Sequence, residues 1–212
     1  MDKAPLAALV LGILLSQSAL VSAGHPVVES RVDAVETIIE ESPFDRGSLE
    51  LQALGGAFFS FNHSPDFDYA VGTLRLGYML YSPNGGGCLR GNTELLLEVF
   101  GGGIFEGPGS GLVGGTLLLR YNFVQPEATV VPYFQIGAGG LYSDAAQDQS
   151  QRLIGSDFEF NLQASIGVRW FCTPRCAFTL EAGYRHISNA DTADRNVGVD
   201  AVGGMLGLSY FF

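Results

Sequence analysis

From Leu49 to the end of the chain, apolar and polar residues alternate with a period of two, which predicts β-strands with one apolar and one polar face. Segments rich in turn-forming residues divide this region into eight stretches. The stretches span residues 49–61, 67–81, 90–105, 112–124, 130–143, 157–171, 177–187 and 200–212. With about 11 to 16 residues each, they exceed a typical strand of a soluble protein and match strands that cross a bilayer at a tilt.

The sixth stretch, DFEFNLQASIGVRWF, shows the alternation most clearly. Its apolar face carries Phe158, Phe160, Leu162, Ala164, Ile166, Val168 and Trp170, and its polar face carries Asp157, Glu159, Asn161, Gln163, Ser165 and Arg169. In other stretches the polar face holds Glu94, Glu98, Glu181 and Arg185. An apolar exterior around a polar interior is typical of a membrane barrel, although a soluble sandwich alternates in the same way.

The N-terminal segment indicates export. Residues 1–23 carry Lys3, an apolar run and small residues before Gly24, the pattern of a cleaved signal peptide. This run is too short for a membrane-spanning helix, and no later stretch offers the roughly 20 apolar residues that such a helix needs. Residues 24–48 are acidic, and we expect a periplasmic leader there, either a short helix or a flexible arm, without activity of its own.

Export and eight long strands together favour the barrel over a secreted sandwich. The terminal LGLSYFF also resembles the C-terminal signature of bacterial outer-membrane barrels. We therefore predict an all-β fold, a single eight-stranded antiparallel transmembrane β-barrel of the bacterial outer membrane, over residues 49–212. Side chains fill a barrel of eight strands, so a diffusive pore is not expected.

An even number of strands places both chain ends in the periplasm. The connections 82–89, 125–129 and 172–176 are then periplasmic, and the connections 62–66, 106–111, 144–156 and 188–199 face outside. Cys88, Cys172 and Cys176 fall in the periplasmic turns, where the compartment permits a local Cys172–Cys176 disulfide and where free thiols are the alternative. They supply too few ligands for zinc, so no metal site is expected.

The formal net charge of −11 and the scarcity of lysine exclude several functions. Lys3 is the only lysine and lies in the predicted signal peptide. Nucleic-acid binding needs clustered lysine and arginine, so nucleic acid is not an expected partner. Without a lysine in the mature chain, the glycine-rich segments are not phosphate-binding loops, and they read instead as strand residues.

The segment YRHISNADTADRNVGVD, residues 184–200, contains several polar residues, and the face of the barrel on which each one lies follows from its position along the strands. In the seventh stretch, His186 and Ser188 share their parity with the lipid-facing Phe178, Leu180, Ala182 and Tyr184. In the eighth stretch, Asp200 shares the parity of the lipid-facing Val202, Gly204, Leu206 and Leu208. An outer loop joins these antiparallel strands, so His186, Ser188 and Asp200 are expected together on the exterior surface near its outer rim.

Charge on the lipid face is destabilising, by about 2–4 kcal/mol for a basic residue at the midplane. One interpretation is therefore chemistry on a lipid by a serine hydrolase. Ser188 would be the nucleophile, His186 the base, and Asp200 the group that orients the imidazole. Asn189 is the candidate oxyanion donor. The alternative is that strand ends simply become polar at the level of the lipid headgroups.

The segment from His186 to Asp200 resembles the active-site stretch of the lipid A 3-O-deacylase (PagL) family, outer-membrane barrels with an H-x-S-N motif and a glutamate fourteen residues after the histidine. His186, Ser188 and Asn189 match that motif, and Asp200 takes the place of the glutamate. Asn196 and Gly198 match the approach to the acid, and PYFQIGAGGLYS resembles a glycine-rich strand of the family. Two further departures are Asp191 in place of glycine and Arg195 in place of proline.

The resemblance implies removal of the ester-linked 3-hydroxyacyl chain at position 3 of lipid A in the outer leaflet. Lipopolysaccharide would be the substrate partner, and no cofactor is implied. Two other functions stay open, a non-catalytic structural or adhesion barrel and an outer-membrane phospholipase. His63, in the first outer loop, reads as a solvated residue. The preferred acyl length and the oligomeric state are not predicted.

Overall fold

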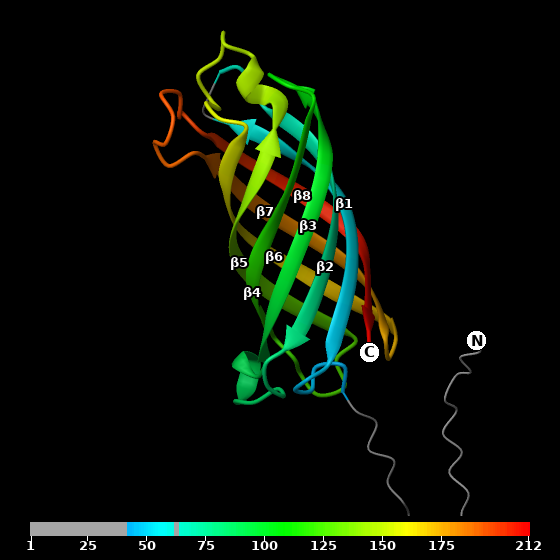
Figure 1. The fold of residues 1–212 in the computed structure, drawn as a ribbon. Helices are drawn as coiled ribbons and strands as arrows, with labels where there is room; N and C mark the ends of the chain where they lie inside the picture. Colours follow the sequence, from blue (N-terminus) through cyan, green and yellow to red (C-terminus); the bar gives the residue numbers. More distant parts are fainter. Residues whose placement is uncertain (1–41, 62–63) are drawn as a thin grey trace, which may run out of the picture. The chain divides into compact units, whose positions relative to one another are not determined.

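The computed structural model describes residues 42–61 and 64–212. The predicted signal peptide, most of the leader and His63 lie outside the described residues. Eight antiparallel strands follow one another around a closed barrel, in which β1 pairs with β8 (Figure 1). The predicted eight-stranded barrel is thereby confirmed. In the described part of the chain, no helix has the length and hydropathy that membrane crossing requires.

The observed strands follow the predicted stretches closely. They are β1 Leu49–Phe61, β2 Asp68–Met79, β3 Asn92–Glu106, β4 Gly111–Asn122, β5 Val130–Ser143, β6 Phe158–Thr173, β7 Cys176–Ser188 and β8 Val199–Phe211. Two of them, β1 and β5, match the predicted bounds, and the others differ by one or two residues at each end. The alternation therefore located the strands because each has one face toward the lumen and one away from it.

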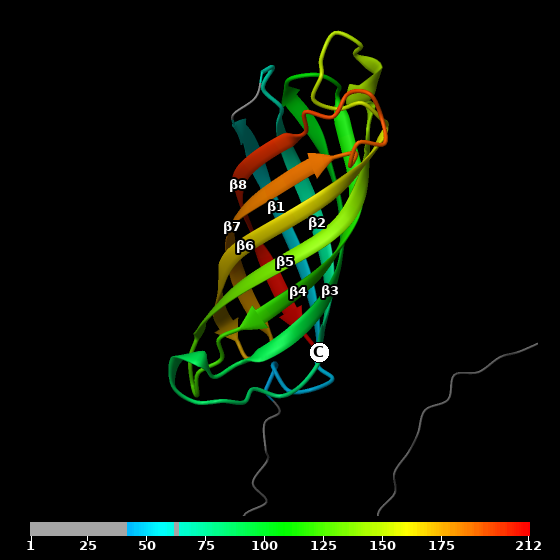
Figure 2. The ribbon, with the colours of Figure 1, turned by 90° about the vertical axis from the view of Figure 1, so that its left-hand side faces the viewer.

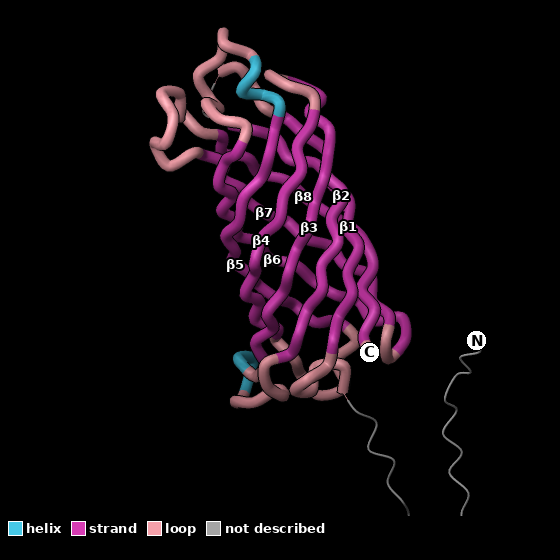
Figure 3. The backbone as a smooth tube through the Cα atoms, viewed as in Figure 1, coloured by secondary structure: helices cyan, strands magenta, loops and turns pink. Residues whose placement is uncertain are grey.

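The barrel has two different ends, which Figures 1 and 3 separate clearly. The end with the four connections β1–β2, β3–β4, β5–β6 and β7–β8 is called the loop end here, and it carries the short helix η2, Asp144–Gln147. The end with the C-terminus is the terminal end, where the connections include the short helix η1, Gly87–Leu89. This arrangement agrees with the predicted alternation of connections between the two ends.

The lumen is filled by paired charges. All five residues that were expected to point inward are buried: Glu94, Glu98, Arg169, Glu181 and Arg185. Arg75 donates to both carboxylate oxygens of Glu181, at 2.7 and 3.0 Å, and to Glu98 at 2.7 Å. Farther along the lumen, Arg120 and Arg169 are paired with the buried Glu50 and Glu94. The filled lumen leaves no wide channel.

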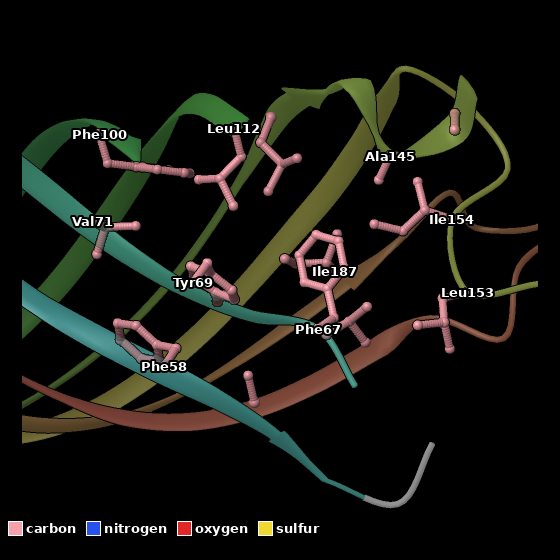
Figure 4. Close-up of a cluster of buried hydrophobic side chains, with 14 of the residues drawn as sticks. Phe58, Phe67, Tyr69, Val71, Phe100, Leu112, Ala145, Leu153, Ile154 and Ile187 are labelled. Atoms are coloured by element: carbon pink, nitrogen blue, oxygen red, sulfur yellow. The ribbon is translucent and has the colours of Figure 1, made fainter. Parts of the chain in front are cut away.

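Apolar side chains close the lumen at the loop end (Figure 4). Phe58, Phe67 and Tyr69 pack there with Ala145, Leu153 and Ile154 of the β5–β6 connection. Ile187 of β7 joins this cluster and is 1% exposed. Because neighbouring strand residues point to opposite faces, the inward Ile187 directs His186 and Ser188 to the exterior.

The terminal end is closed by the last leader residues. Phe44 is buried against Phe171 and Phe211, with ring centroids 5.7 and 5.5 Å away. Its carbonyl accepts a hydrogen bond from Nδ2 of Asn92 at 2.7 Å. The three cysteines are free thiols, and the Sγ atom of Cys172 lies 3.3 Å from the carbonyl oxygen of Cys176. Of the two alternatives for these cysteines, the structure contains the free thiols.

Candidate active site

His186 and Asp200 are direct partners in the antiparallel register of β7 and β8. Figure 2 shows these two strands side by side near the loop end. Nδ1 of His186 lies 2.7 Å from Oδ1 of Asp200, and the two side chains are 33% and 25% exposed. Directly opposed side chains in such a pair have Cβ atoms about 4.5–5.5 Å apart. A short aspartate therefore reaches the imidazole without any distortion of the strands.

The other imidazole nitrogen faces Ser188. Nε2 of His186 lies 3.0 Å from Oγ of Ser188, two residues farther along the same face of β7. With the proton on Nδ1, this imidazole donates to Asp200 and accepts from the serine hydroxyl. A continuous hydrogen-bonded chain thus joins hydroxyl, imidazole and carboxylate, the arrangement that activates a serine nucleophile.

The chain of three residues lies on the exterior face of the barrel. Across the β6–β7 register, Ser188 is paired with Phe160 and His186 with Leu162, and both apolar side chains are exposed. On the other side, Asp200 is paired with the exposed Phe61 of β1. The predicted exterior position of His186, Ser188 and Asp200 is therefore what the structure contains, with apolar side chains flanking the polar groups.

Asn189 directly follows Ser188, but its backbone and side-chain NH groups are engaged within the β7–β8 connection. Its side chain is buried, and Nδ2 donates to the carbonyl of Arg195 at 2.8 Å. Its backbone NH donates to Oδ1 of Asn196 at 2.8 Å. The next two residues, Ala190 and Asp191, have φ values of 52° and 61°, in the left-handed region. Asn189 thus fixes a tight left-handed turn directly after the serine.

Three further features of the site were not predicted from the sequence. The hydroxyl of Tyr184 donates to Oδ1 of Asp200 at 2.5 Å. Nδ2 of Asn196 donates to Oδ1 of Asp191 at 2.8 Å, which braces the left-handed turn. Gly198 has a φ of 79°, and an added Cβ would lie 3.4 Å from Cε1 of His186 and 3.1 Å from the carbonyl oxygen of Ile187. The parity of Tyr184 was visible in the sequence, whereas its reach toward Asp200 depends on the β7–β8 register.

Arg195 fastens the β7–β8 connection to the β5–β6 connection. Its guanidinium donates to three backbone carbonyls, those of Ala146 at 2.8 Å, Asp148 at 2.7 Å and Gln151 at 3.0 Å. Backbone bonds from Val197 and Gly198 to the same connection add to this junction. The turn after Ser188 is therefore held by a neighbouring loop as well as by its own strands. Sequence reasoning had noted Arg195 only as a departure from the family pattern.

No cluster of three or more histidine, cysteine or acidic side chains that could hold a metal ion occurs among the residues described. A serine hydroxyl bonded to an imidazole, which is in turn bonded to a carboxylate, is suited to acyl transfer.

Comparisons with known proteins agree with this picture. Among solved structures, the crystal structure of the outer membrane enzyme PagL has a TM-score of 0.54 and 16% sequence identity, and the match covers 74% of this chain and 97% of that chain. The crystal structure of Neisserial surface protein A has a TM-score of 0.54 and 18% identity, with coverage of 79% and 100%. At these identities the two likenesses establish the fold. No curated protein sequence matches the chain.

The family model described as Lipid A 3-O-deacylase (PagL) matches residues 55–209. This range begins in β1, ends in β8 and contains His186, Ser188 and Asp200. The family and the closed barrel with its apolar exterior place the protein in the bacterial outer membrane. Because the match spans most of the chain and its whole candidate site, the chain belongs to the lipid A 3-O-deacylase (PagL) family.

Proposed function

We propose that this protein is a lipid A 3-O-deacylase that works as a serine esterase in the outer leaflet. The observation that carries the proposal is the hydrogen-bonded chain from Ser188 through His186 to Asp200 on the exterior face. Membership of the deacylase family supports the same substrate class. The reaction removes the ester-linked 3-hydroxyacyl chain at position 3 of lipid A.

The three side chains have distinct roles in the proposed reaction. Oγ of Ser188 attacks the ester carbonyl while Nε2 of His186 takes its proton. The tetrahedral intermediate collapses, the ester C–O bond breaks, and the imidazolium returns the proton to the sugar oxygen that leaves. Water then cleaves the acyl-serine by the same proton path and releases the 3-hydroxy fatty acid. Asp200 orients the imidazole and stabilises its charged form.

The developing oxyanion needs hydrogen-bond donors close to Ser188. Asn189 was the candidate donor, yet its side-chain and backbone NH groups are bonded to Arg195 and Asn196. We assign the donor role instead to the backbone NH groups of Ala190 and Asp191. Neither NH group donates a hydrogen bond to another residue that the structure describes. Asn189 contributes to the oxyanion site by holding the turn that carries these two groups.

The surroundings of the site suit the two halves of a lipid A molecule. Phe160 and Leu162 are 44% and 52% exposed and lie directly beside Ser188 and His186, so acyl chains can lie along them in the bilayer. A polar pocket of about 640 Å³ at the loop end is lined by Thr192, Arg195 and residues of the β5–β6 connection. It offers hydroxyl, amide and carboxylate groups next to the turn that follows Ser188, where the sugar part of lipid A would lie.

The test is mass spectrometry of lipid A incubated with the refolded wild-type barrel and with Ser188→Ala. Loss of one 3-hydroxyacyl mass with the wild type alone supports the proposal. Ser165→Ala is a matched control, because this serine lies on the other face of β6 from the site. An unchanged lipid A spectrum from folded wild-type protein would favour a non-catalytic barrel.

A second substrate separates the deacylase from a phospholipase. Phospholipid vesicles replace lipid A in the same incubation, and lysophospholipid is measured. Lysophospholipid formed as fast as lipid A is deacylated would contradict the proposed substrate. Production by Ser188→Ala as well would show that Ser188 is not the nucleophile.

A further inference from the structure

We propose that Tyr184 is a positioning residue that holds the carboxylate of Asp200 in place for His186. The inference rests on the proposed function, because it assigns a part of the same site. Its basis is one shared atom. Oδ1 of Asp200 accepts a hydrogen bond from the Tyr184 hydroxyl at 2.5 Å and lies 2.7 Å from Nδ1 of His186.

The strand register explains how the tyrosine reaches this atom. Tyr184 is paired with Val202, so Asp200 is its diagonal neighbour on the same face of the sheet. Diagonal neighbours are about 7–8 Å apart, within reach of an aromatic side chain. The ring of Tyr184 lies 6.4 Å from the ring of Phe61, and Phe61 is the β1 partner of Asp200. Aromatic side chains from two strands therefore flank the carboxylate.

Asp200 lies at the barrel exterior with its side chain 25% exposed, so the orientation of its carboxylate depends on the groups that bind it. A hydrogen bond from a tyrosine hydroxyl to an ionised carboxylate is of the strong, charge-assisted kind. With Oδ1 fixed by this bond, the imidazole meets its acceptor in one orientation, and Nε2 is kept toward Ser188.

The direct test is NMR of selectively labelled histidine in detergent-refolded wild type and Tyr184→Phe. A carboxylate that drifts from Nδ1 weakens the Nδ1–H hydrogen bond of His186, so the signal of that proton should move upfield and broaden by exchange with water in the variant. Tyr210→Phe is the matched control on the exterior of β8, and it should leave this signal unchanged. An unchanged Nδ1–H signal of His186 in Tyr184→Phe would overturn the proposal.

This NMR measurement does not depend on turnover, so it separates the positioning role from the proposed function. If wild type fails to deacylate lipid A while the Nδ1–H signal changes as expected in Tyr184→Phe, the deacylase proposal fails and the positioning role of Tyr184 stands. If wild type is active and the signal is the same in both proteins, the role of Tyr184 fails alone.

Kinetics of lipid A deacylation give a second readout. Tyr184→Phe should lower kcat about ten-fold with little change in KM, because the tyrosine acts on the orientation of the imidazole. In an Asp200→Ala background the same substitution should change kcat by less than about two-fold, since no carboxylate is left to hold. Equal losses in both backgrounds would mean that Tyr184 is merely structural.

Discussion

His186 and Asp200 lie opposite each other in the β7–β8 ladder, with Nδ1 2.7 Å from Oδ1. This direct pairing explains how the shorter aspartate can contact the imidazole at the position where the family pattern has glutamate. Replacement of Asp200 by asparagine should lower kcat at least about 100-fold, because the amide favours the wrong imidazole tautomer. Steady-state release of 3-hydroxy fatty acid from lipid A measures this.

Asp200→Glu is the informative companion variant. The longer side chain retains the charge, and rotation about its extra bond lets it approach Nδ1, so we expect activity within about ten-fold of wild type. Equal activity of the asparagine variant and wild type would remove Asp200 from the mechanism.

The sequence was sufficient to predict the strands that form the barrel wall and the face of that wall on which the site lies. A period of two tells which face each residue takes, so the exterior position of His186, Ser188 and Asp200 could be predicted. The register of β7 against β8 could be anticipated only roughly, because the length of the β7–β8 connection allows several pairings. The contact of Tyr184 with Asp200 depends on that register and was therefore not predicted.

The turn after Ser188 was harder to predict for a different reason. Left-handed backbone is usually signalled by glycine, and here it falls on Ala190 and Asp191. Without that signal, nothing in the sequence indicates that the side chain of Asn189 turns inward to Arg195. The contacts of Arg195 with the β5–β6 connection are likewise formed between segments more than 40 residues apart, which local patterns do not report.

Asp191→Asn should raise kcat about three- to ten-fold. The exposed Asp191 carboxylate lies in the turn assigned to the oxyanion and repels the charge that develops there. Asparagine also tolerates φ values near 60°, and its side-chain oxygen can still accept the bond from Asn196. The gain should shrink at high salt, because salt screens exposed charges. A lower kcat at low salt, with unchanged KM, would contradict the assignment of the turn.

Arg195→Ala should lower kcat about ten-fold while the barrel remains folded. The substitution removes three bonds to the carbonyls of the β5–β6 connection, and misplacement of the turn by a fraction of an ångström weakens catalysis. Faster amide hydrogen exchange over residues 189–198 should accompany the loss. Arg152→Ala is the control, because this arginine is exposed on the same connection. Equal exchange in both variants would exclude the proposed role.

The Asp144 carboxylate should remain ionised at pH values well below those at which an aspartate is normally protonated. Hydrogen bonds from the hydroxyl and NH of Ser110, and from the NH of Gly111 at 3.1 Å, lower the pKa of Asp144 to about 2. Because the folded pKa lies below the unfolded value of about 3.9, this contact contributes fully above pH 4 and is lost as the pH falls through about 2. The amide shifts of Ser110 and Gly111 should titrate with that midpoint. A midpoint near 4 would show that the bonds do not form.

Glu181→Ala should reduce the free energy of unfolding of the barrel by about 3–5 kcal/mol, because it leaves the buried guanidinium of Arg75 with one carboxylate in place of two. Reversible urea unfolding in lipid vesicles measures the change. The double variant Arg75→Met/Glu181→Leu removes both charges of the pair and should recover part of the loss, since Glu98 keeps Gln163 at 2.7 Å and Arg185 at 3.5 Å after Arg75 is removed. Deacylation per folded molecule should stay unchanged in the double variant, because the pair lies in the lumen and the catalytic side chains lie on the exterior. A single-variant loss below about 1 kcal/mol would mean that water or another residue already compensates Arg75.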